Sequence, residues 1–149
     1  MSSVDPGPGD LTAGNGVPPV VDHLPVRFQR VESGFLAVVT AVAFVHLGYS
    51  WWWLLALFLV FDLSMVGYVG SPRLGAWTYN LVHSYLAPAA LGVAAVIDDA
   101  RWAAFLSLVW AFHIAVDRLL GYGLKFQDRF EHTHLGRIGR DPGDAEQGT

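Results

Sequence analysis

The sequence contains no cysteine. Disulfide bonds, cysteine-ligated zinc, iron–sulfur clusters and thiol nucleophiles are therefore excluded, and any metal would have to be held by imidazole, carboxylate, amide or backbone groups. Charge is also scarce, since charged residues make up 15% of the 149 residues, against about 25% in a typical soluble domain. The net charge of −4 gives no indication of a nucleic-acid partner.

What the sequence has instead is long apolar stretches. Between positions 33 and 97 the only formal charges are Asp62 and Arg73. Crossing the hydrocarbon core of a bilayer takes about 17 to 25 apolar residues, and a helix of a soluble bundle keeps a polar face. The sequence therefore predicts a multi-pass membrane protein in contact with lipid. Its four predicted spans are residues 33–49, 51–69, 74–97 and 102–120.

The connections between these stretches are short, which makes consecutive helices antiparallel neighbours. We predict an all-α fold: a polytopic membrane protein with four transmembrane helices in an up-down bundle, covering residues 30–126. Residues 1–29 are rich in proline and glycine and are predicted to be a disordered tail, and residues 127–149 form a C-terminal tail. Pro88 lies inside the third span and should kink it.

Lysine and arginine are distributed unequally between the two sides of the predicted bundle. With the N-terminus in the cytoplasm, eight of the nine basic residues fall inside and only Arg101 falls outside. Cytoplasmic loops carry an excess of such residues, so we predict that both termini are cytoplasmic and that the protein lies in a plasma membrane. The eight inner basic residues are Arg27, Arg30, Arg73, Arg118, Lys125, Arg129, Arg137 and Arg140.

Polar residues of three predicted helices fall at a similar depth, within about 5 to 15 Å of the inner ends of the helices at 1.5 Å per residue. Residues three or four apart share a helix face, which pairs Asn80 with His83 and His113 with Asp117. Exposing them, or Asp62, to lipid would be costly. We therefore expect these five side chains to form one inward-facing cluster that opens to the cytoplasm.

Three interpretations of this cluster are open. Two imidazoles and two carboxylates are suitable ligands for zinc, manganese or iron, so Asp62, His83, His113 and Asp117 could hold a divalent metal. Haem ligation by the two histidines is a less favoured form of this interpretation. Alternatively, the side chains tie helices together by hydrogen bonds, or they conduct protons or ions.

Three further polar residues lie near the end of the fourth span. Arg118 could reach lipid phosphate groups or bind a phosphate of a substrate. His132 and His134 are two residues apart, so an extended backbone would present both on one side. They could cover the cluster, bind a metal themselves, or dock the tail at the membrane interface.

Segments 61–68, 79–85, 113–125 and 133–136 resemble those of a family of small bacterial four-helix membrane proteins catalogued as a domain of unknown function. The resemblance extends from about Arg30 to Arg137 and covers four separate motifs in order. It implies a four-helix membrane fold and supplies no activity. The positions that it implies belong to the family are Glu32, Asp62, Asn80, His83, His113 and Asp117.

A weaker resemblance links the pair His113 and Asp117 to bacterial membrane-bound metal-dependent hydrolases, which carry a His-x-x-x-Asp pair on a membrane helix. It suggests a hydrolase acting on a lipid-like or phosphorylated substrate. In that hypothesis Asp62 is a fourth ligand or a base that activates water, Asn80 orients a ligand or the substrate, and Arg118 holds a phosphate. The alternatives are a non-enzymatic small subunit or assembly partner of a membrane complex, or a protein that handles protons or ions.

Overall fold

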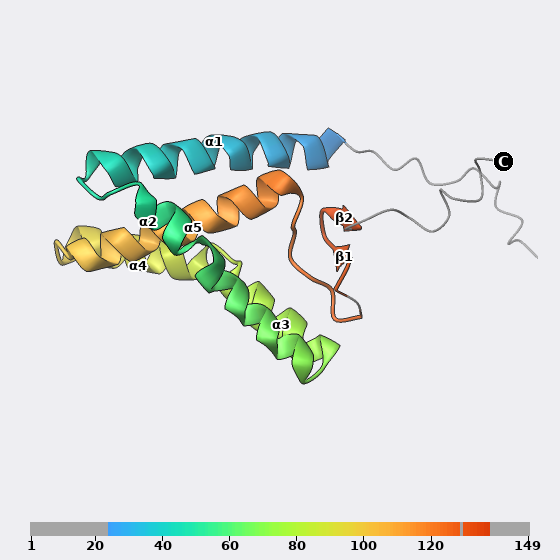
Figure 1. Cartoon of the computed structure of the whole chain (residues 1–149). Coiled ribbons are helices and arrows are strands. Elements are labelled where there is room, and N and C mark those ends of the chain that lie inside the picture. The colour runs from blue at the N-terminus through green and yellow to red at the C-terminus, as the bar shows by residue number, and fades with distance from the viewer. Residues whose placement is uncertain (1–23, 129, 138–149) are drawn as a thin grey trace, which may run out of the picture.

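The computed structural model describes residues 24–128 and 130–137 (Figure 1). The regular secondary structure of the described residues is helical except for one short hairpin after the last helix. The elements in chain order are α1 (Leu24–His46), α2 (Trp52–Ala56), η1 (Phe58–Val69), α3 (Pro72–Val82), α4 (Leu86–Ile97), α5 (Arg101–Leu120), β1 (His132–Thr133) and β2 (Gly136–Arg137).

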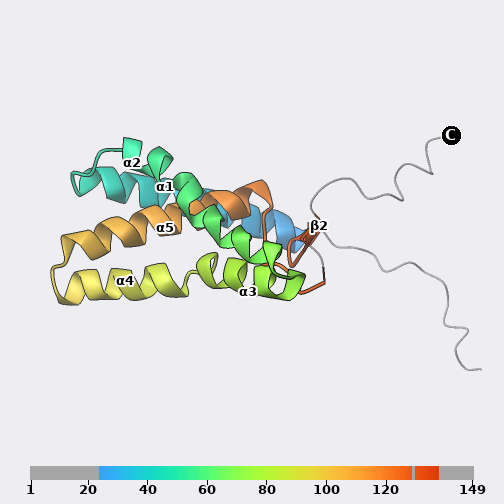
Figure 2. The same cartoon turned by 60° about the horizontal axis from the view of Figure 1, so that its bottom comes forward.

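These elements form four helical segments that are each long and apolar enough to cross a membrane. The prediction of an all-α, multi-pass membrane protein is confirmed. Successive segments run in opposite directions, so the start of the first, the connection of the second to the third, and the end of the fourth lie on one side (Figures 1 and 2). The assignment of that side to the cytoplasm stays a prediction. The four segments are Leu24–His46, Trp52–Val69, Pro72–Ile97 and Arg101–Leu120.

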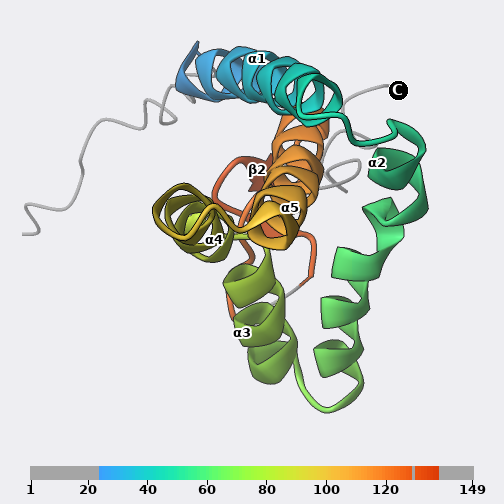
Figure 3. The ribbon, with the colours of Figure 1, turned by 90° about the vertical axis from the view of Figure 1, so that its left-hand side faces the viewer.

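Helix α5 is the centre of the structure. It packs against α1 on one side and α4 on the other, whereas η1 packs mainly against α3 and only slightly against α5 (Figure 3). Close approach of η1 and α3 requires glycine: a Cβ at Gly75 would collide with the Tyr68 ring, and one at Gly67 with Thr78. The pair η1–α3 leans away from the end of α5. The candidate site lies between this pair and the end of α5.

The first helix begins at Leu24, earlier than the predicted boundary at residue 30. Proline is tolerated in the first turn of a helix, so Pro25 does not delay the start. Directly after this additional turn, Arg30 Nε donates to the Leu119 carbonyl at 2.8 Å and so ties α1 to the end of α5. The rest of the predicted N-terminal tail lies outside the described residues.

The second and third spans are not continuous α-helices. The second changes from α2 to the 3₁₀ helix η1, which carries Asp62. The third is interrupted between Val82 and Leu86. The predicted effect of Pro88 is confirmed, but the break lies one turn before it, because proline has no N–H to donate to the carbonyl four residues earlier. This break places His83 at a helix end in the middle of the protein.

Candidate metal centre

Four predicted ligands lie together in the structure, although they come from three different spans. Asp62 is on η1, His83 is at the break between α3 and α4, and His113 and Asp117 are one turn apart on α5. One ligand atom of each lies within 4.8 Å of all the others. His83, His113 and Asp117 are buried, and Asp62 is partly exposed. This group could hold a metal ion.

Five separations that involve the two imidazole nitrogens are close to those of a tetrahedral site, whereas the largest separation allowed within the group is 4.8 Å. His83 Nε2 lies 3.0 Å from His113 Nε2, 3.5 Å from Asp62 Oδ1 and 3.4 Å from Asp117 Oδ2. His113 Nε2 lies 3.7 Å from each of the same two carboxylate oxygens. Four ligands about 2.0 to 2.1 Å from a zinc ion would be about 3.3 Å apart. The 3.0 Å between the two imidazole nitrogens also leaves no space for a porphyrin between the rings.

His83 is held by the residue one turn before it. Its Nδ1 lies 2.9 Å from the Tyr79 carbonyl, and its ring stacks on the Tyr79 ring with centroids 3.7 Å apart. A carbonyl accepts only, so Nδ1 carries the proton and donates it. In the neutral imidazole Nε2 is then an unprotonated acceptor. The local fold therefore directs a free lone pair of His83 toward the cluster, as is usual for a metal-binding histidine.

His113 is oriented by packing. It is fully buried, and its ring lies against Phe58 and Phe61, with centroids 4.8 and 5.2 Å away. Its Nδ1 faces the Phe58 backbone but makes no hydrogen bond of good geometry with any described residue. These aromatic neighbours could not be predicted from local sequence, because they are more than fifty residues from His113.

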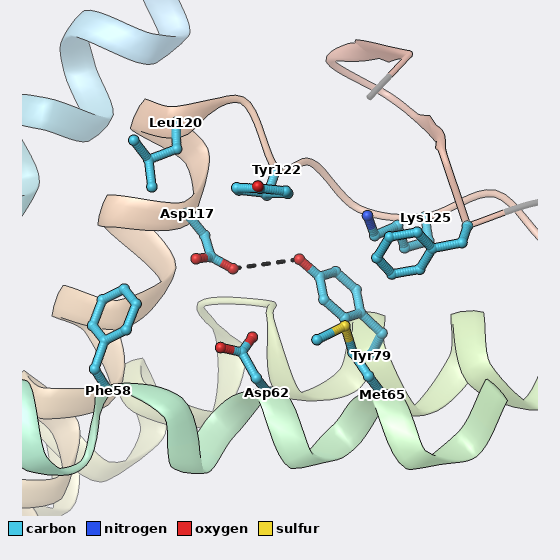
Figure 4. A pocket seen from close by; sticks show the side chains of 9 residues that line it. Phe58, Asp62, Met65, Tyr79, Asp117, Leu120, Tyr122 and Lys125 are labelled. Atoms are coloured by element: carbon cyan, nitrogen blue, oxygen red, sulfur yellow. Dashed lines mark hydrogen bonds between the residues drawn. The ribbon is translucent and has the colours of Figure 1, made fainter. Parts of the chain in front are cut away.

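The two carboxylates occupy different surroundings. Asp117 is the more enclosed, with a side chain 12% exposed, and the Tyr79 hydroxyl donates to its Oδ2 at 3.4 Å. The Asp62 side chain is 23% exposed. Both line a cavity of about 400 Å³ between η1, α3 and the end of α5 (Figure 4). The cluster is therefore accessible from a space large enough for part of a small molecule.

The cavity has a mixed lining. Phe58, Met65, Leu120 and Phe130 provide apolar walls around the two carboxylates. Tyr79, Tyr122 and Lys125 bring hydroxyl groups and one ammonium group into the same space (Figure 4). A cavity with mainly apolar walls and a few convergent polar groups is typical of a site for a small molecule.

Lys125 is the basic group of this cavity. The residue is only 4% exposed, and its Nζ lies 4.0, 5.0 and 5.8 Å from the ring centroids of Phe130, Tyr79 and Tyr122. Among the described residues Nζ has no hydrogen-bond partner. Burial lowers the pKa of Lys125 to about 8, although the charge of Asp117 acts in the opposite direction. From the sequence, Lys125 was predicted only as one of the basic residues on the inner side, and its place in the cavity follows from the fold.

Asn80 was expected to join the cluster of the four predicted ligands, but in the structure it is hydrogen-bonded to Lys125 instead. Its Nδ2 donates to the Lys125 carbonyl at 2.8 Å, and its Oδ1 accepts from the Lys125 backbone N–H at 2.7 Å. The amide group is thus used in holding the segment after α5 against α3. Asn80 reaches the cavity only through Lys125, and its predicted action on a ligand or substrate stays a prediction.

Arg118 also points elsewhere. Its guanidinium lies 4.6 Å from the centroid of the Tyr85 ring, and Nη2 donates to the His83 carbonyl at 3.5 Å. Arg118 therefore supports the broken end of α3 and does not line the cavity that contains the carboxylates. Its predicted role in holding a phosphate stays a prediction.

The hairpin after α5 is packed against the segment that carries Lys125. His134 Nδ1 accepts from the Leu124 backbone N–H at 2.8 Å, and Lys125 pairs with Thr133 in an isolated β-bridge. Burial lowers the pKa of His134. His134 thus docks the tail, which was one of the three alternatives for the two hairpin histidines. The side chain of His132 lies outside the described part of the chain.

Fold and site together define a multi-pass helical membrane protein with a buried His/Asp cluster that could hold a metal ion. The family model described as Domain of unknown function (DUF4260) matches residues 26–138, and the chain belongs to this family. The resemblance inferred from the sequence motifs is thus confirmed. No curated protein matches the chain, and no solved structure matches it.

Proposed function

We propose that this protein is a membrane-embedded, metal-dependent hydrolase that acts on a lipid-like or phosphorylated substrate. The observation that supports the proposal is the position of the cluster: four metal-ligand atoms lie within 4.8 Å of one another, and two of the four residues line a cavity of about 400 Å³. A cluster that served only to join helices would not need such a space beside it.

A metal explains the cluster better than hydrogen bonds do. His83 donates from Nδ1 to a carbonyl, and ionised carboxylates only accept. His113 can supply one proton to the group, at 3.0 Å from His83, and the Tyr79 hydroxyl donates to Asp117 at 3.4 Å. The carboxylates otherwise face imidazole lone pairs at 3.4 Å or more. A divalent cation would satisfy all four acceptors and neutralise both carboxylates inside the membrane.

The donor set indicates which metals to test. Two imidazole nitrogens and two carboxylate oxygens suit zinc, manganese or iron, and the approximately tetrahedral arrangement favours zinc among them. When bound, such a metal supplies a Lewis acid that polarises a phosphoryl or carbonyl oxygen. In this proposal His83, His113 and Asp117 are ligands. Asp62, which is more exposed and lines the cavity, is a fourth ligand or the general base.

Metal analysis of the purified protein tests the proposal directly. The wild-type protein, purified in detergent without chelator, should contain about one equivalent of zinc, manganese or iron. His113→Ala should contain less than a tenth of that amount. His46→Ala is the matched control, because His46 is exposed at the end of α1 and its replacement should leave the metal content unchanged. Wild-type protein without metal, even after incubation with each ion, would overturn the proposal.

One alternative has specific support. Four protein ligands can complete a tetrahedral site, as in structural zinc centres, and a metal bound in that way would only fasten η1, α3 and α5 in a non-enzymatic subunit. Asp62→Asn separates the two. If Asp62 is the general base, Asp62→Asn keeps the metal and loses hydrolysis of lysophosphatidate and of p-nitrophenyl phosphate. If Asp62 is the fourth ligand of a structural centre, Asp62→Asn lowers the metal content instead. A metal-containing wild type inactive on esters and phosphates alike would favour the structural role.

A further inference from the structure

Lys125 is unusual because a charged side chain is enclosed without an anionic partner. Its Nζ is buried and has no hydrogen-bond partner among the described residues. The carboxylates of Asp117 and Glu131 both act on it electrostatically, but no ion pair within 4.0 Å joins Lys125 to either of these two described residues. Three aromatic rings surround the ammonium group without neutralising it. Charged groups are rarely buried unless they are paired.

The backbone around Lys125 is fixed on both sides. The Asn80 side chain is hydrogen-bonded to both the N–H and the carbonyl of Lys125, and the β-bridge to Thr133 holds it from the hairpin. The ammonium group points into the cavity toward Tyr79 and Tyr122 (Figure 4). A binding group is effective when its position is set before the ligand arrives.

From these observations we infer that Lys125 is the anion-binding residue of the cavity, and that it receives the phosphate group of an amphiphilic phospholipid or lysophospholipid. The apolar lining by Phe58, Met65 and Leu120 fits the adjoining glyceride or acyl part. A phosphate has several oxygens and can therefore contact Lys125 and the cluster at the same time. This inference names the substrate class of the proposed hydrolase and rests on that proposal for the reaction, but the binding itself requires no reaction.

The position of the cavity supports a ligand from the bilayer. It lies between η1 and the end of α5, two elements that contact each other only slightly. The outward faces of these segments carry exposed apolar side chains, among them Leu63 and Val66 on η1. A lipid could therefore keep its acyl chain among other lipids while its phosphate reaches Lys125.

Binding of lipids to the protein in nanodiscs tests the inference. Wild type and Lys125→Met, both in nanodiscs and both with their metal content measured, are titrated with a short-chain fluorescent phosphatidate and with the matching phosphatidylglycerol and diacylglycerol. Loss of a charged hydrogen bond costs about ten- to a hundredfold in affinity. We expect this loss for phosphatidate in Lys125→Met, partial recovery in Lys125→Arg, and no binding of diacylglycerol to any variant.

Arg73→Gln is the matched control, since it removes one exposed cation from the same side of the protein. Equal binding by wild type and Lys125→Met, or an equal loss in Arg73→Gln, would overturn the inference. Competition by inorganic phosphate as effective as by phosphatidate would keep the anion site but overturn the lipid assignment. Lys125-dependent binding by protein that never holds metal would support the inference while the proposed hydrolase fails. If the protein binds metal but Lys125→Met does not change lipid binding, the inference about Lys125 is overturned while the proposed hydrolase stands.

Discussion

The two ends of the helical bundle are built in different ways. At the end that includes the connections after α1 and α4, the core contains Phe44, Leu54 and Val109. Its polar groups are paired: Tyr49 donates to the Arg101 carbonyl at 2.6 Å, and the Arg101 guanidinium donates to the Leu47 carbonyl at 2.9 Å. Arg101, the basic residue that the sequence places on the outer side, thus joins two connections.

The end that includes the chain termini contains the His/Asp cluster and the cavity. The buried side-chain atoms without a hydrogen-bond partner, among the described residues, belong to the elements around this end and the break in the third span: Ser64 Oγ, Tyr68 OH, Tyr85 OH, His113 Nδ1 and Lys125 Nζ. Unsatisfied buried polar groups cost stability, and they are typical of sites that bind something. The comparison shows that paired polar groups occur at one end and unsatisfied ones at the other, where we propose that the function lies.

The largest expected effect is that of metal removal, which should affect only the terminal end. A ligand present at a thousand times its dissociation constant stabilises the native state by about 4 kcal/mol. We therefore expect chelation to lower the thermal unfolding temperature of wild type markedly and that of His113→Ala hardly at all. Hydrogen exchange should accelerate in η1 and around His83 and stay unchanged around Phe44. Uniform acceleration along the chain would contradict the separation of the two ends.

The next effect belongs to the opposite end. Phe44 is fully buried and lies 4.9 and 5.3 Å from the rings of Tyr49 and Phe105. Phe44→Ala should cost about 2 to 4 kcal/mol of unfolding free energy, because the cavity that it leaves loses packing contacts. Metal content per folded molecule should not change. Measurement of both quantities on one preparation checks this, and a parallel fall in metal content would show that the two ends are coupled.

Hydropathy and the depth of the polar residues were enough to predict the four spans and the four clustered ligands, because a membrane restricts where charge can lie. They could not predict the 3₁₀ geometry of η1, since no local pattern in its apolar sequence distinguishes it from an α-helix. The contacts of Asn80 and Lys125 join residues 45 positions apart. Such pairing depends on the tertiary arrangement of α3 and the last segment, which composition and spacing do not reveal.

A smaller effect is expected for two polar links, one between α3 and the segment after α5 and one between α4 and α5. Asn80→Ala removes two hydrogen bonds to the Lys125 backbone and should cost about 1 to 2 kcal/mol. Ser107→Ala removes the bond to the Pro88 carbonyl at 2.7 Å and should cost about 1 kcal/mol. Limited proteolysis should cleave the segment after α5 faster only in Asn80→Ala. Equal cleavage of both variants would mean that Asn80 does not hold this segment.

The smallest expected effect has the opposite sign. Lys125→Met should raise the unfolding free energy at pH 7, by about 1 kcal/mol or less, because it removes a buried charge while keeping the apolar contacts with the rings. Burial lowers the pKa of Lys125 to about 8 in the folded protein, against an ordinary value of about 10.4. Below pH 8 the lysine is charged in both states, so the folded state carries the full cost of the charge.

Between about pH 8 and pH 10 the unfolded chain binds more protons at this position than the folded one does, so the stability of wild type rises with pH. Lys125→Met lacks this contribution, and its advantage should therefore shrink over the same interval. Thermal unfolding of both proteins from pH 7 to pH 10, in metal-containing and chelated samples, measures the difference. If Lys125→Met were less stable at pH 7, the lysine would be a structural cation held by its three rings, and the terminal end would be satisfied in the same way as the opposite one.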